Sequence, residues 1–84
     1  MKLYYVTFRS VTFAQRGERL LQKHNIRCSL MRTPRWMEEQ GCGYALKCWT
    51  KEIGPVAELL RGQGIVMRRI YIQRQDGNLE ELEL

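Results

Sequence analysis

The feature of this chain that most restricts its fold is a pattern of strand, helix and strand that occurs twice. The two halves are weakly alike, because residues 18–26 resemble residues 58–65. The strands are expected at residues 3–8, 26–32, 44–49 and 65–73, and the helices at residues 11–24 and 54–61. Since crossover connections within one sheet are right-handed, this order predicts a ferredoxin-like α+β fold. We expect a βαββαβ two-layer sandwich with a four-stranded antiparallel sheet, its first and third strands in the middle, and two helices on one face.

The third predicted strand indicates which way the sheet faces. An unpaired ammonium between sheet and helices would cost several kcal/mol, so Lys47 is expected on the open face. Because side chains alternate along a strand, its neighbours then divide into two sets. Those expected to point inward are Tyr44, Leu46 and Cys48, and those expected on the open face are Ala45, Lys47 and Trp49.

Single residues mark the ends and the irregular points of the other elements. Ser10 is expected to cap the first helix, and Asn25 to end it in the left-handed conformation. Gly17 lies on the apolar side of this helix, which indicates a close approach of helix to sheet. In the last strand, Arg68 and Arg69 break the alternation, which indicates a bulge or an edge position.

Length and charge limit the classes of protein that fit. The 84 residues suffice for one two-layer domain, expected at residues 1–74. Residues 75–84 read as a turn followed by an acidic tail that is either disordered or lies back across the basic surface. We expect a cytoplasmic protein without membrane contact, because the chain lacks a long apolar run and a secretory signal pattern. The net charge of +5, with ten arginines and four lysines, favours anionic partners of any class.

Residues 34–46 are the stretch that the repeated halves do not explain, and they contain a cysteine between two glycines. Gly41 and Gly43 leave the backbone beside Cys42 free of Cβ atoms. The loop can therefore turn sharply and present its amides and its sulfur to an anion or to an incoming sulfur atom. The charges of Arg35, and of Arg32 if the loop folds back, favour the thiolate form, whereas those of Glu38 and Glu39 oppose it, so the sequence leaves the sign of the pKa shift open. The alternative is a tight turn that includes a cysteine by chance.

The other cysteines and the single histidine fit structural roles better. Three cysteines without a Cys-x-x-Cys pair argue against a disulfide framework and a structural zinc site. Cys28 and Cys48 fall at inward strand positions and are expected in the core. His24 is expected to be a half-buried helix-end residue. Without a carboxylate pair, phosphate loop or nucleophile-base pair, we expect no metal and no cofactor, and favour a carrier or binding protein over a self-contained enzyme.

Several short motifs follow one another in a particular order and spacing: residues 5–12, Ala14, Glu18, residues 20–21, residues 34–35, Cys42-Gly43 and residues 45–46. Together they resemble the family of small bacterial domains described as selenium or sulfur carrier-like proteins. The resemblance covers roughly residues 4–72. It implies a carrier thiol at Cys42 that holds persulfide or selenide for transfer between a donor and an acceptor protein. It also implies supporting positions at Arg9, Pro34, Arg35 and Gly43.

Two other functions fit parts of the pattern. The first is a ferredoxin-like RNA-binding module, because residues 43–49 superficially resemble the RNP1 motif. The register argues against it, since RNP1 aromatics stand on the open face whereas Tyr44 and Leu46 are expected to point inward. The second is a non-catalytic homodimer that uses the open sheet face with Trp49, Lys47 and the arginine-bearing strands.

Overall fold

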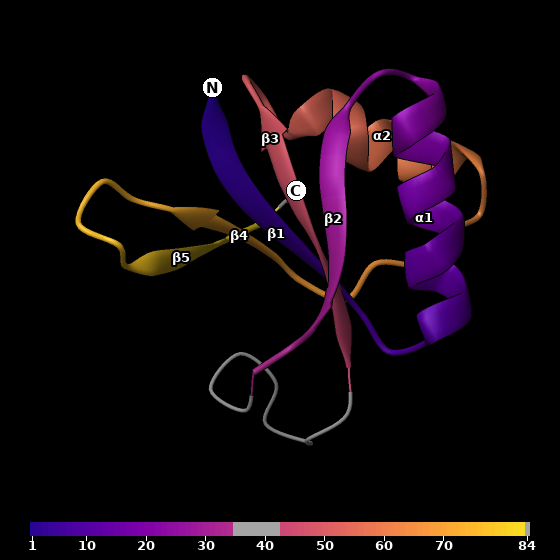
Figure 1. Cartoon of the computed structure of the whole chain (residues 1–84), viewed down its shortest axis with the longest axis horizontal. Helices are drawn as coiled ribbons and strands as arrows, with labels where there is room; N and C mark the ends of the chain where they lie inside the picture. The colour runs from indigo at the N-terminus through magenta and orange to yellow at the C-terminus, as the bar shows by residue number, and fades with distance from the viewer. Residues whose placement is uncertain (35–42, 84) are drawn as a thin grey trace.

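The computed structural model describes residues 1–34 and 43–83 of the chain. Its elements, in chain order, are β1 (Lys2–Phe8), α1 (Val11–Lys23), β2 (Arg27–Arg32), β3 (Tyr44–Thr50), α2 (Gly54–Gly62), β4 (Ile70–Gln73) and β5 (Leu79–Leu82). The strands form one antiparallel sheet, and both helices lie on the same side of it (Figure 1). The predicted α+β architecture is therefore confirmed.

The described sheet has five strands in the order β2-β3-β1-β4-β5, whereas the sequence predicted four. The expected neighbours β1 and β3 lie side by side, with Tyr5 opposite Lys47. On its other side β1 pairs with β4, where Tyr5 lies opposite Tyr71. The order departs from a simple ferredoxin-like sheet because β5 adds to β4, with Tyr71 opposite Glu81. This addition makes β1 the middle strand.

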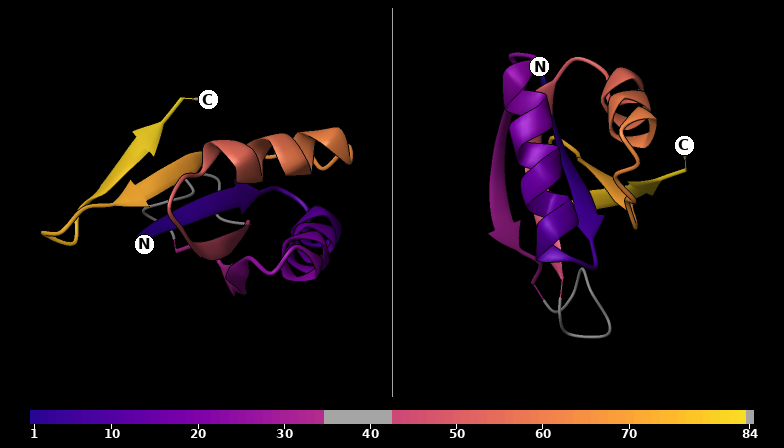
Figure 2. Two further views of the ribbon diagram at one scale, coloured as in Figure 1. Left: turned by 90° about the horizontal axis from the view of Figure 1, so that it is seen from above. Right: turned by 90° about the vertical axis from the view of Figure 1, so that its right-hand side faces the viewer.

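The segment expected as an acidic tail, residues 75–84, contains the turn and the strand that complete this sheet (Figure 2). Asp76 Oδ1 accepts a hydrogen bond from the Asn78 amide at 2.9 Å. Gly77 has a φ of 88°, a conformation that glycine adopts without a Cβ clash. Leu82 packs against the core. The turn expected here is present, but the segment after it is a strand and not a tail, because its backbone pairs with β4 while Glu80 and Glu81 stay exposed.

β4 is shorter than the strand predicted at residues 65–73, because it begins at Ile70. It is also not an edge strand, since β5 pairs with its outer side. The five residues before it lead from α2 to the sheet without strand structure. Within them Ile65 is 3% exposed and belongs to the core, whereas Val66 is 64% exposed.

The first helix begins and ends as predicted. Ser10 Oγ accepts hydrogen bonds from the amides of Thr12, at 3.1 Å, and Phe13, at 3.4 Å. The chain leaves the helix through Asn25 at a φ of 60°. His24 is exposed and not half-buried, because it follows the last helical turn as the C-cap residue. Neither described helix is long and apolar enough to cross a membrane.

The core lies between the helices and the inner face of the sheet. Its members with no exposed surface include Val6, Phe8, Ala14, Leu21, Leu46, Cys48 and Leu60. The predicted facing of β3 is thereby confirmed for Leu46 and Cys48, and Tyr44 packs against the same core. Ala45, which was expected on the open face, is fully buried. Its short side chain lies in register between Met31 and Thr7, which flank it on the neighbouring strands.

Gly17 lies where α1 meets the sheet and α2. A Cβ atom at this position would lie 3.1 Å from Leu46 Cδ1 and 3.3 Å from Leu60 Cδ2. Both leucines are fully buried and have little room to move. The predicted close approach of the helix at this glycine is confirmed.

We expect Gly17→Ala to destabilise the fold by about 1 kcal/mol. The gain in helix propensity is about 1 kcal/mol, but overpacking of a tight core costs about 1–3 kcal/mol. The measurement is urea unfolding. Gly62→Ala is the matched control, because a Cβ atom at this helical position would meet nothing within 4 Å. A Gly17→Ala variant as stable as Gly62→Ala would contradict the tight contact.

Candidate functional site

The candidate site lies at the end of the sheet where β2 stops and β3 starts. Of the predicted site residues, Arg35, Gly41 and Cys42 lie outside the described residues. Gly43 is buried, and its carbonyl oxygen accepts a hydrogen bond from the Thr33 amide at 3.1 Å. This bond continues the β2–β3 ladder by one step and closes the base of the connection. Cys42 precedes Gly43 directly in the sequence.

The base of this connection includes a buried hydroxyl. Thr33 Oγ1 has no exposed surface and no hydrogen-bond partner among residues 1–34 and 43–83. A buried hydroxyl usually finds a partner, because leaving it unpaired costs free energy. Thr33 therefore offers a donor at the closed end of the β2–β3 hairpin.

Two arginines stand beside this base: Arg32, the last residue of β2, and Arg9, which follows β1. The Arg32 guanidinium lies 5.9 Å from the centre of the Tyr44 ring, with which it pairs across β2 and β3. Phe8 lies opposite Tyr44, so Arg9 follows at the same end of the sheet as Gly43. Arg9 is exposed. The structure thus brings Arg9 and Gly43, both predicted, to one end of the sheet.

Two further arginines, Arg68 and Arg69, are held at this end by a single threonine. The Thr7 amide donates to the Arg69 carbonyl oxygen at 2.8 Å, and the Arg68 amide donates to the Thr7 carbonyl oxygen at 2.7 Å. Two residues thus oppose one, which is the arrangement of a β-bulge. The Thr7 hydroxyl accepts from the Arg69 amide at 3.0 Å and lies 3.3 Å from its carbonyl oxygen.

Sequence reasoning did not place these arginines at the site, although their break in the alternating pattern was the available signal. The bulge that this break indicated is present, and the edge position is not. Both arginines are the residues that oppose Thr7 in this bulge, and Thr7 lies near the loop end of the sheet, so both stand at that end. Both also have interactions of their own.

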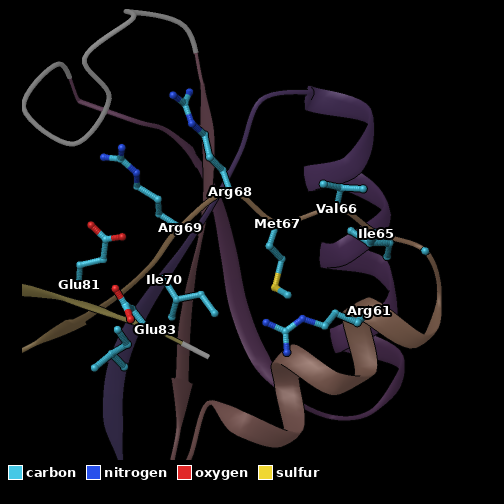
Figure 3. A pocket seen from close by; sticks show the side chains of 11 residues that line it. Arg61, Ile65, Val66, Met67, Arg68, Arg69, Ile70, Glu81 and Glu83 are labelled. Atoms are coloured by element: carbon cyan, nitrogen blue, oxygen red, sulfur yellow. The ribbon is translucent and has the colours of Figure 1, made fainter.

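Two hollows adjoin this region. The first, of about 520 Å³, lies between α2, the start of β4 and the end of β5 (Figure 3). Its charged lining is Arg61, Arg68, Arg69, Glu81 and Glu83, so it does not select a ligand by charge. The second, of about 370 Å³, lies beside the start of α1, and Arg9 and Arg68 are its cationic residues.

The cysteines of β2 and β3 are held as neutral thiols. Burial, and then the charge of Glu18, raise the pKa of Cys28 to about 11. Burial, with a smaller contribution from Cys28, raises the pKa of Cys48 to about 12. Cys28 Sγ also contacts the Glu18 carbonyl oxygen at 3.8 Å, and Cys48 Sγ the Leu46 carbonyl oxygen at 3.7 Å. The prediction that both are packing residues is confirmed.

The expected obstacle to RNP1-type RNA binding is present. Leu46 and Cys48 face the core with no exposed surface, and Tyr44 packs against the core as well. RNP1 aromatics must stack bases on the open face. Tyr44 and Leu46 are therefore turned the wrong way for that role.

Comparison with known proteins gives one match. A family model described as "Putative Se/S carrier protein-like" matches residues 3–72. No curated protein and no solved structure matches the chain. The matched range runs from β1 nearly to the end of β4 and includes Cys42-Gly43.

We expect Thr7→Val to destabilise the fold by about 1–2 kcal/mol. The change keeps the shape of a fully buried side chain but removes the hydroxyl that binds the Arg69 backbone. Thermal or urea unfolding measures the loss. Thr12→Val makes the same change on the exposed side of α1 and should alter stability by less than about 0.5 kcal/mol. Equal effects of the two substitutions would contradict the role of Thr7.

We expect one fast-reacting thiol in the folded protein at pH 8, and its loss in Cys42→Ser. A thiol with a pKa of about 11 is thiolate in only about one molecule in a thousand at this pH, and the thiolate is the reactive form. Raising the pH from 8 to 10 should accelerate labelling of Cys28 about tenfold per pH unit. Iodoacetamide labelling followed by peptide mass spectrometry measures each rate. In denaturant all three cysteines should react at similar rates, and fast labelling of Cys28 or Cys48 in the folded state would contradict their protection.

Proposed function

Because the chain belongs to the putative Se/S carrier protein-like family, we propose that it carries sulfur or selenium as a persulfide or selenide on the Cys42 thiol. A donor protein loads this thiol and an acceptor protein unloads it. The chain then acts as a carrier between partner proteins and not as a self-contained enzyme.

The observation that carries this proposal is the state of the other two cysteines. Cargo binding needs a thiolate that a partner protein can reach. The pKa values of Cys28 and Cys48 are raised to about 11 and about 12, and Cys48 has no exposed surface. Since the chain has three cysteines, the carrier role falls on Cys42.

The surroundings of the β2–β3 connection support a thiolate. Arg9 and Arg32 stand at the same end of the sheet as Gly43, and positive charge lowers the pKa of a neighbouring thiol. Arg35, which follows the described residues 1–34 directly in the sequence, is a third arginine close to Cys42 along the chain. Thr33 Oγ1 offers a hydroxyl donor at the base of the connection. These groups favour an anionic cargo as well as the empty thiolate, because a persulfide is itself an anion.

The proposed transfer needs no external oxidant. The Cys42 thiolate attacks the terminal sulfur of a persulfide on the donor. A sulfur–sulfur bond forms at Cys42 while the bond in the donor breaks, and the donor cysteine leaves as a thiolate. The acceptor thiolate then attacks the terminal sulfur on Cys42. A sulfur–sulfur bond forms on the acceptor, the bond at Cys42 breaks, and Cys42 leaves as a thiolate. The selenium reaction has the same balance, with a selenium atom in the terminal position.

We expect Cys42 to gain one sulfur atom when the protein is incubated with a cysteine desulfurase and free cysteine. Intact-mass measurement detects the added atom, and a reductant should remove it. Cys42→Ser should take up no sulfur. Cys28→Ser is the matched control, because it removes a thiol of raised pKa and should leave uptake within about twofold of the parent.

Two results would end the proposal. One is equal uptake by Cys42→Ser and the parent, which would place the cargo elsewhere. The other is no uptake by either protein when the desulfurase itself carries a persulfide under the same conditions.

A further inference from the structure

The face of the sheet opposite the helices presents partly exposed aromatic and aliphatic side chains. No described helix lies on it (Figure 2). Near its centre stand Leu3 and Tyr5 of β1, with Trp49 of β3 and Tyr71 of β4 beside them. The Tyr5 hydroxyl donates to Gln73 Oε1 at 3.1 Å, so its ring is held across the neighbouring strand. The centre of this open face is therefore largely apolar.

The charges on the open face are arranged unevenly about this centre. Towards the β2 edge, the Arg27 guanidinium lies 4.8 Å and the Lys47 ammonium 5.3 Å from the Trp49 ring. Towards the opposite edge, Glu81 of β5 stands exposed, in register with Tyr71. Arg69 lies on the same side and has an interaction of its own. One half of the face is basic, and its other edge carries an exposed carboxylate.

We infer that the open face binds a second copy of the same chain, through a two-fold axis that runs parallel to β1. In the order β2-β3-β1-β4-β5, β1 is the middle strand. Rotation about an axis along it stacks β1 on β1, β3 on β4 and β2 on β5 of the second copy. The apolar centre then meets itself, and the basic half of each copy meets the carboxylate-bearing edge of the other.

The register makes this charge pairing specific. Ser29, Lys47, Tyr5, Tyr71 and Glu81 form one row across the face. In the stacked pair, Glu81 of one copy lies over Ser29 of the other. The small serine leaves room for the carboxylate beside Arg27 and Lys47, the two cationic side chains toward the β2 edge. Lys47 comes to lie over Tyr71, which also favours a cation.

Other occupants fit this charge pattern less well. A two-fold axis across the strands would stack β2 on β2 and β5 on β5, so that like charges meet. A single-stranded nucleic acid would gain from the basic half but would place phosphates near Glu81. Its bases would also compete with Arg27 and Lys47 for the Trp49 ring.

The size of the face indicates the strength of the contact. Five strands about 4.8 Å apart and β1 at about 3.3 Å per residue give a face of roughly 450 Å² per copy. A standard stable interface covers about 800 Å² per partner, so we expect a weak dimer with a Kd on the order of 10–100 μM. Because the axis runs parallel to β1, the Thr33–Gly43 ends of both copies lie at the same end of the dimer. The contact between the two sheets therefore leaves these ends uncovered.

Sedimentation equilibrium of the full chain between about 5 μM and 1 mM tests the inference, a range that spans the expected Kd. Lys47→Glu and Glu81→Lys should each raise the dimer Kd at least about tenfold, because each places like charges at adjacent positions across the interface. The double variant, Lys47→Glu with Glu81→Lys, should restore the Kd to within about threefold of the parent. An equimolar mixture of the two single variants should form heterodimers for the same reason.

Matched controls make the same charge changes on the helix side. Lys23→Glu at the end of α1 and Glu58→Lys on α2 are both exposed and should leave the Kd unchanged. A parent that stays monomeric to 1 mM overturns the inference. So does a double variant that fails to dimerise, because the axis would then be wrong. Binding of a uridine oligonucleotide to the monomer, lost in Trp49→Ala, would assign the face to nucleic acid instead.

Discussion

The pairing of β1 on both of its sides is the interaction on which the rest of the structure depends. β1 forms antiparallel ladders with β3 and with β4, so its backbone groups are used on both edges. Its inner side chains Val6 and Phe8 have no exposed surface and belong to the core between the sheet and the helices. Because every other strand pairs with β1 directly or through one neighbour, its position determines the layers, the order and the centre of the open face.

One residue of β1 also links the fold to the candidate site. Thr7 bonds to two consecutive arginines through its backbone and its hydroxyl, which interrupts the β1–β4 ladder at the loop end of the sheet. At the same end the Thr33–Gly43 bond closes the β2–β3 connection. A small domain without a deep enclosed cavity can still concentrate positive charge at one point in this way. The two packed cysteines are held differently, since burial raises their pKa values and keeps both thiols neutral.

The sequence supported correct predictions wherever a single residue type leaves little choice. Lys47 could not be buried unpaired, so the facing of β3 followed, and the core positions of Leu46 and Cys48 with it. A glycine on the apolar side of a helix lowers helix stability, so Gly17 indicated a close contact. Leu46 and Leu60 make that contact. Sequence reasoning failed for β5, because its few apolar residues, such as Leu82, become useful only beside β4. It also missed the part that Arg68 and Arg69 play, because their location depends on Thr7, more than sixty residues away in the chain.

By itself, the sequence determined the two-layer arrangement of helices and strands, the sides that they bury, the caps of α1 and the one cysteine outside these elements. These features depend on local spacing and on the cost of burying charge, which neighbouring residues reveal. Only the tertiary structure decided the fifth strand, the bulge that gathers the arginines, and the separation of basic and acidic edges on the open face. Each of these joins residues that are distant in sequence, so no local pattern contains it.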